Sequence, residues 1–76
     1  MNMQRRKRIE KAGRALEELL EEIQALQEEE HDAYVNMPES LQSSERGESM
    51  YEAYTNLEDV AFSLEEVIEN LADVIK

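Results

Sequence analysis

The side chains best suited to acid–base or metal chemistry surround the single histidine, His31, whose acidic neighbours are Glu28, Glu30 and Asp32. Glu28 and His31 have the i, i+3 spacing with which helical bundles hold paired metal ions, and dimerisation would double that set. However, Glu30 is the only acid at a core-type position, and one histidine without cysteine makes a poor metal centre. We therefore expect a solvated histidine, no metal site and no cofactor.

Nucleophilic catalysis has little support in the sequence. Its candidate nucleophiles, which lack a plausible base and orienting group, are Ser40, Ser43, Ser44 and Ser49. The chain has no cysteine, so disulfides are excluded as well. The sequence predicts a protein that is not an enzyme.

A second group of side chains is suited to binding an anion. Arginine offers forked donors to phosphate, tyrosine offers a stacking face, and asparagine or glutamine can contact base edges. In an antiparallel dimer the N-terminal arginines of one subunit would approach the loop of the other. The composite nucleotide pocket would then contain Arg5, Arg6, Arg8, Tyr34, Asn36, Gln42 and Arg46. Alternatively, the basic cluster is a solvated end that balances the acidic body.

Charge is distributed unevenly along the chain, whose formal net charge is −11. Six of the eight basic residues lie in the first fourteen positions, and from Ala15 to Ile75 there are 18 acidic residues against Arg46 alone. Such a body repels phosphate, so we expect no direct binding of duplex nucleic acid. Its acidic faces are either a plain solvated surface or a mimic of nucleic acid that binds a basic protein surface.

Two helices must position these groups. In the first segment, apolar residues recur with the a/d spacing of a heptad repeat at Ile9, Ala12, Leu16, Leu19, Ile23, Leu26 and Ala33. Leu20 widens this row, and Glu30 interrupts it. Strong helix formers fill the remaining positions, so we expect a helix over about residues 3–35. Its basic N-terminus and acidic C-terminal half oppose the helix macrodipole, so packing must stabilise it.

The middle of the chain interrupts the helical pattern. Pro38 cannot continue the first helix, but it can begin a short turn. Ser43 or Ser44 then offers a cap for a second helix, with Glu45 and Glu48 in its favourable first turn. We expect a loop over about residues 36–43 and a helix over about 44–74.

The second helix has an apolar face three positions wide. Its heptad row contains Met50, Ala53, Leu57, Val60, Leu64, Val67, Leu71 and Val74, and a parallel row contains Tyr54, Ala61, Ile68 and Ile75. A face of this width suits a helix that contacts two neighbours. Because a chain of this size rarely builds a sufficient core alone, we predict one all-α domain, residues 1–76. It would form a long antiparallel helical hairpin that dimerises into a four-helix bundle.

No apolar run approaches the roughly 20 residues that a membrane span requires. The basic N-terminus is not followed by an apolar stretch, as it would be in a secretory signal. We therefore expect a cytoplasmic protein without a membrane partner.

The loop carries a resemblance. Its residues Asn36-Met37-Pro38-Glu39-Ser40-Leu41-Gln42 and Ser44-Glu45-Arg46-Gly47-Glu48 resemble those of short acidic two-helix proteins of bacteria, phages and prophages. Those proteins also begin with an Arg-Arg-Lys segment, here Arg5-Arg6-Lys7. The resemblance implies a helical hairpin, possible phage origin and no particular activity.

The main functional hypothesis is a non-enzymatic, self-associating interaction module whose loop faces a partner or ligand. The alternative is a phage-type inhibitor of a host defence system. Such an inhibitor would act as an acidic mimic of nucleic acid or would sequester a nucleotide signal.

Overall fold

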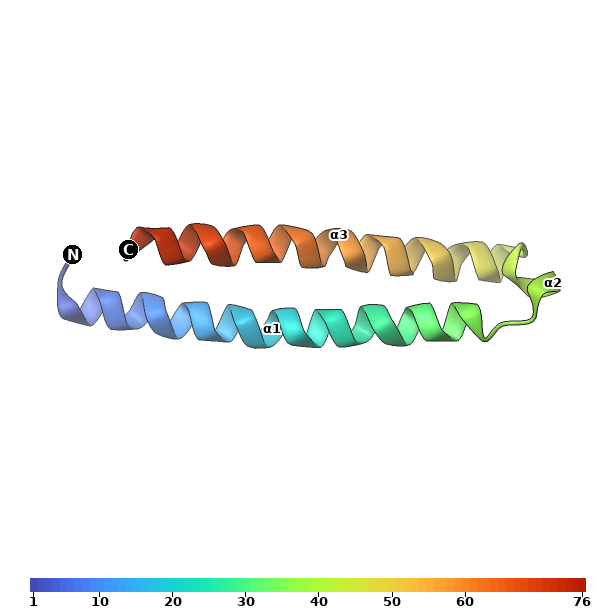
Figure 1. Ribbon diagram of the computed structural model, residues 1–76, viewed down its shortest axis with the longest axis horizontal. Coiled ribbons are helices and arrows are strands. Elements are labelled where there is room, and N and C mark those ends of the chain that lie inside the picture. The colour runs from blue at the N-terminus through green and yellow to red at the C-terminus, as the bar shows by residue number, and fades with distance from the viewer.

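The computed structural model describes all 76 residues as a long helical hairpin. Helix α1 (Met3–Val35) and helix α3 (Glu45–Val74) lie side by side and antiparallel, joined through the short helix α2 (Glu39–Gln42) (Figure 1). The molecule measures 59 × 14 × 14 Å between Cα atoms. These observations confirm the predicted all-helical hairpin.

The N-terminal end of α1 is stabilised in two ways. The side-chain oxygen of Asn2 accepts a hydrogen bond from the backbone N–H of Arg5 at 2.8 Å, which makes Asn2 the N-cap. Arg6 donates from its guanidinium to the carbonyl oxygen of Ile75, just past the end of α3. Because the antiparallel neighbour brings its negative C-terminal end beside the arginines, the hairpin offsets the unfavourable macrodipole of α1.

The break between the long helices is held by a side chain of α2. Gln42 donates from its amide nitrogen to the carbonyl oxygens of Tyr34 and Met37, at 3.2 and 3.3 Å. Pro38 precedes α2 as its N-cap instead of occupying its first turn, and its carbonyl accepts from the N–H of Leu41. Gln42 therefore adds a side-chain donor at the end of α1, where the carbonyl of Tyr34 also accepts from the backbone N–H of Met37.

Helix α3 begins at the cap offered by Ser44, whose hydroxyl accepts from the N–H of Gly47 at 3.3 Å. Gly47 is buried beneath the end of α2, and a Cβ there would lie 2.2 Å from the carbonyl oxygen of Gln42. Gly13 differs, because a Cβ there would meet Leu71 at an ordinary 3.9 Å. A close helix crossing is therefore not the reason for Gly13.

The seam between α1 and α3 follows a heptad pattern on both helices. Residues at the a and d positions are half-buried in α1 at Ile9, Gly13, Leu16, Leu20, Ile23, Gln27, Glu30 and Tyr34. The matching row, half-buried or buried, contains Gly47, Met50, Tyr54, Leu57, Ala61, Leu64, Ile68, Leu71 and Ile75. The row predicted for α1 is correct at Ile9, Leu16 and Ile23, but Leu19 and Leu26 lie outside the seam, where the next residues, Leu20 and Gln27, are half-buried instead. The row predicted for α3 is displaced in the same way, because Val60 and Val67 are exposed beside Ala61 and Ile68.

The hairpin by itself has almost no core. Only Gly47 and Ala61 are buried, and Ala61 is the only hydrophobic residue among them. The chain exposes 5994 Å² of surface, whereas a compact monomer of its mass exposes about 4,800 Å². One seam between two helices leaves a large part of the apolar surface in contact with solvent.

Candidate functional site

The most extended candidate site is a row of apolar side chains just outside the seam, which we call the apolar stripe. It occupies the g position, the residue before each a position, on both long helices. Its members are Ala12, Leu19, Leu26 and Ala33 in α1, and Ala53, Val60, Val67 and Val74 in α3. All are exposed except Ala53, which is half-buried, and the leucine and valine side chains remain 44–55% exposed.

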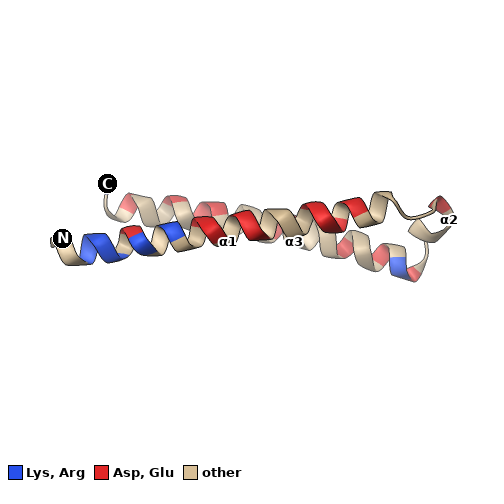
Figure 2. Cartoon of the chain, turned by 90° about the horizontal axis from the view of Figure 1, so that it is seen from below, with Lys and Arg blue, Asp and Glu red and all other residues tan.

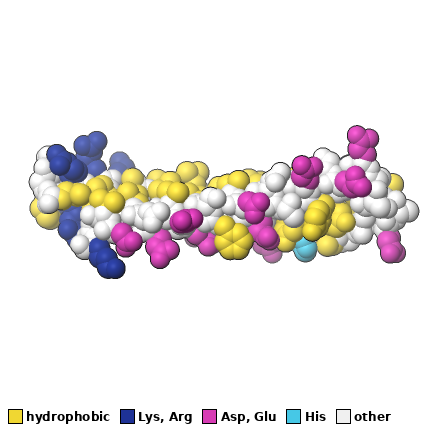
Figure 3. All heavy atoms as spheres, turned by 90° about the horizontal axis from the view of Figure 1, so that it is seen from above, with side chains coloured by type: hydrophobic (Ala, Val, Ile, Leu, Met, Phe, Trp, Pro, Cys, Tyr) yellow, Lys and Arg dark blue, Asp and Glu magenta, His cyan; other side chains and the backbone are white.

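The two halves of the apolar stripe lie on the same face of the hairpin. In an antiparallel pair of helices, e positions lie beside e positions and g positions beside g positions. The e side is identified by Gln24 and Glu65, which approach to 3.4 Å between amide nitrogen and carboxylate oxygen. The g positions therefore share the opposite face. Seen from the α3 side, hydrophobic side chains gather along one edge from the end that holds the termini past the middle, and acidic side chains lie along that edge near the loop (Figure 3).

The stripe residues of α1 and those of α3 also lie at matching positions along the long axis of the hairpin. The ring of Tyr34 packs against that of Tyr51, and the ring of His31 against that of Tyr54, so residues whose numbers add up to about 85 lie at the same level. This register places the members of the stripe in neighbouring pairs: Ala12 with Val74, Leu19 with Val67, Leu26 with Val60, and Ala33 with Ala53. The result is a continuous band of four apolar layers.

Acidic side chains avoid the α3 side of the apolar stripe. All nine acidic residues of α3 lie at b, e or f positions of the heptad. The positions four residues before the stripe, which adjoin it on the helix surface, hold Ser49, Asn56, Ser63 and Asn70. The corresponding positions of α1 hold Arg8, Ala15, Glu22 and Glu29. The stripe thus has an uncharged border on α3 and a partly charged border on α1.

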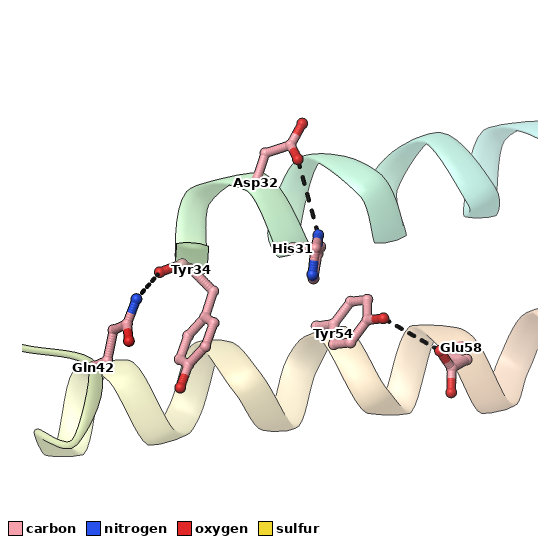
Figure 4. Close-up of polar contacts among 6 residues, drawn as sticks. All are labelled: His31, Asp32, Tyr34, Gln42, Tyr54 and Glu58. Atoms are coloured by element: carbon pink, nitrogen blue, oxygen red, sulfur yellow. Dashed lines mark hydrogen bonds and ion pairs between the residues drawn. The ribbon is translucent and has the colours of Figure 1, made fainter. Parts of the chain in front are cut away.

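An aromatic cluster lies on the opposite, e side near the loop (Figure 4). The rings of His31 and Tyr54 are 4.8 Å apart between centroids, and those of Tyr34 and Tyr51 are 5.5 Å apart. The hydroxyl of Tyr54 donates to a carboxylate oxygen of Glu58 at 3.3 Å. Sequence reasoning missed this cluster, because its members come from two helices and meet only after the chain folds back.

His31 is consequently more than a solvated side chain, although 46% of its side-chain surface is exposed. It packs against Tyr54, and its Nδ1 lies 3.9 Å from a carboxylate oxygen of Asp32. Glu28 does not join it in a binding arrangement: no three histidine, aspartate or glutamate side chains converge as metal ligands would. The chemistry available here is aromatic packing.

The residues of the predicted composite pocket lie in two groups at opposite ends of the molecule. Basic residues occupy the N-terminal end of α1, while acidic residues follow the rest of the chain (Figure 2). Arg5 and Arg8 are exposed at that end and line an open hollow of about 490 Å³ with Asn2, Gln4 and Lys7. The guanidinium of Arg6 donates to the carbonyl oxygen of Ile75, and its Nε lies 3.9 Å from a carboxylate oxygen of Glu10.

The other group surrounds the loop. Tyr34 belongs to the aromatic cluster, and the amide nitrogen of Gln42 donates a hydrogen bond to the carbonyl oxygen of Tyr34 at the end of α1. Asn36 is the C-cap of α1 and donates from its backbone N–H to the carbonyl oxygen of Asp32. Arg46 is exposed in the first turn of α3, in line with the apolar stripe. A single chain therefore does not assemble the predicted pocket.

No protein-family model, curated protein or solved structure matches the chain. Neither long helix contains a stretch apolar enough to cross a lipid bilayer.

Proposed function

We propose that this protein is a self-associating interaction module, and that a second copy covers the apolar stripe to form a four-helix bundle. The observation that carries the proposal is the apolar character of the eight successive g positions between Arg5 and the end of α1 and between Arg46 and the end of α3. The hairpin leaves about half of the surface of each stripe leucine and valine exposed. A neighbouring hairpin gives a reason for their apolar character, because it would bury them.

The size of this face agrees with the proposal. A face as long and as wide as the molecule, 59 by 14 Å, covers about 800 Å², the area that each partner buries in a standard interface. The hairpin also exposes about 1,200 Å² more surface than a compact monomer of its mass. A second copy supplies the missing core without a disulfide or a metal.

In such a bundle the faces away from the stripe stay in contact with solvent. These faces carry the nine acidic residues of α3 and the aromatic cluster near the loop. The bundle would therefore present an acidic surface, suited to a protein partner with a basic surface. The loop from Asn36 to Ser43 would remain accessible at the end of each hairpin.

The proposal is tested by placing a charge on the stripe and, separately, beside it. Val60 lies on the stripe and is 48% exposed, whereas Phe62 lies outside it and is 64% exposed. We expect sedimentation equilibrium to give the mass of a dimer for the wild type and for Phe62→Glu, but that of a monomer for Val60→Glu. A monomeric wild type at micromolar concentration, or equal disruption by both variants, would overturn the proposal.

A further inference from the structure

We infer that the two copies pair with their loops at opposite ends, so that the N-terminal arginines of each copy lie over the loop of the other. This inference rests on the proposed self-association and adds the orientation of the partner. It follows from the symmetry of the apolar stripe and from the charges at the two ends of the hairpin.

The apolar stripe alone permits two orientations. On α1 it is centred between Leu19 and Leu26, and on α3 between Val60 and Val67, which lie at the same level of the hairpin. A twofold axis at this level, perpendicular to the long axis of the hairpin and parallel to the apolar face, superposes the two stripes. In that arrangement the loops lie at opposite ends and α1 of one copy lies over α1 of the other. A twofold axis along the hairpin can superpose them with the loops at the same end, α1 over α3. Every layer is apolar in both arrangements.

The charges distinguish the two orientations. The end that holds both termini, residues 1–14 and 63–76, carries seven basic and five acidic side chains, for a net charge of +2. The loop end, residues 27–50, carries one basic and seven acidic side chains, for a net charge of −6. When the loops lie at opposite ends, each terminal end, with a net charge of +2, lies beside a loop end with a net charge of −6. When the loops lie at the same end, the two loop ends of −6 lie beside each other. Electrostatic complementarity therefore selects opposite ends.

Individual side chains agree with this selection at the ends of the stripe. Arg5 continues the stripe row by one heptad, and Arg8 lies four residues before Ala12. Pairing of Leu19 with Leu26 of the partner subunit places both arginines over the partner's break between α1 and α2. The carboxylates of Asp32 and Glu39 flank that break. Arg5 and Arg8 would thereby meet the partner's loop, whereas Tyr34 stays with the aromatic cluster on the opposite face.

One unfavourable contact occurs only in the opposite-end orientation, so it can be used to test that orientation. Glu22 adjoins the stripe at the level of the twofold axis, so it would face Glu22 of the partner subunit. With the loops at the same end, it would face Ser63 of the partner subunit instead. Removal of the like-charge contact by Glu22→Gln should therefore tighten the dimer about twofold. An unchanged dissociation constant would contradict the opposite-end arrangement.

The decisive experiment measures distances between spin labels, which attach cleanly because the chain contains no cysteine. In a dimer of Ser40→Cys labelled at the loop, opposite ends predict a label separation close to the 59 Å length of the hairpin. Mixed dimers of Ser40→Cys and Gln4→Cys should give a short intersubunit distance. A short distance between the two Ser40→Cys labels would overturn the orientation.

A control label separates failure of the orientation from failure of self-association. Glu66 is exposed on the outer face of α3, near the middle of the molecule. Labels at Glu66→Cys lie within measurable reach of each other in both orientations. An intersubunit distance there, together with a short Ser40→Cys distance, would refute the orientation alone. No intersubunit distance for Glu66→Cys would refute the proposed self-association, and the orientation with it.

Discussion

Truncation of Leu19 offers a quantitative test of the apolar stripe, because this side chain lies outside the seam. Leu19 is 55% exposed in the single hairpin, and full burial of a leucine contributes about 1.5–3 kcal/mol. Burial of the exposed half therefore contributes about 1 kcal/mol per subunit, or about 2 kcal/mol per dimer. Leu19→Ala should raise the dissociation constant about thirtyfold, while alanine preserves the helix.

Leu41→Ala is the matched control. Leu41 is 48% exposed, has the same side chain and lies in α2, away from the stripe. Both variants should be compared with the wild type by sedimentation equilibrium and by thermal unfolding over a hundredfold range of concentration. The wild-type midpoint should rise with concentration, because association stabilises the folded state. Equal effects of the two truncations, or a midpoint independent of concentration, would refute the reasoning.

Three further variants test the local structure by chemical denaturation. Gly13→Ala should stabilise the fold by about 1 kcal/mol, because the added methyl fits beside Leu71 and alanine favours the helix. Gly47→Ala should instead destabilise it, because its methyl would collide with the backbone of α2; an equal gain at both glycines would contradict this packing. Gln42→Ala should cost about 1 kcal/mol, since the carbonyl of Met37 loses its donor while that of Tyr34 keeps the backbone N–H of Met37. An unchanged free energy of unfolding would show that water replaces that donor without penalty.

Gln42 also illustrates how a candidate ligand-binding residue can have a structural explanation. Its amide was a reasonable candidate for base recognition, but within the hairpin it joins α2 to the end of α1. Arg6 is similar, because its guanidinium already contacts the carbonyl of Ile75. Arg5, Arg8 and Arg46 stay exposed, so they are the members of the predicted pocket with most freedom to bind an anion.

Residue types and their spacing were enough to predict the helices and the break between them. Heptad spacing and strong helix formers indicated two long helices, and Pro38 with the serines after it marked where they separate. The three-position apolar face of α3 also indicated that one neighbour would not bury it. These features are local, since they depend on residues only a few positions apart.

The choice of the apolar row that forms the seam depends on how the two helices pack against each other. Leu19 and Leu20 are adjacent in the sequence and equally hydrophobic, so periodicity could not choose between them. The antiparallel contact buries the row of Leu20 and leaves that of Leu19 exposed, and this choice creates the apolar stripe. The same fold brings His31 against Tyr54 and places the arginines of α1 beside the C-terminal end of α3. Contacts between such distant residues depend on the relative rotation and register of two helices, which the pattern within either helix does not specify.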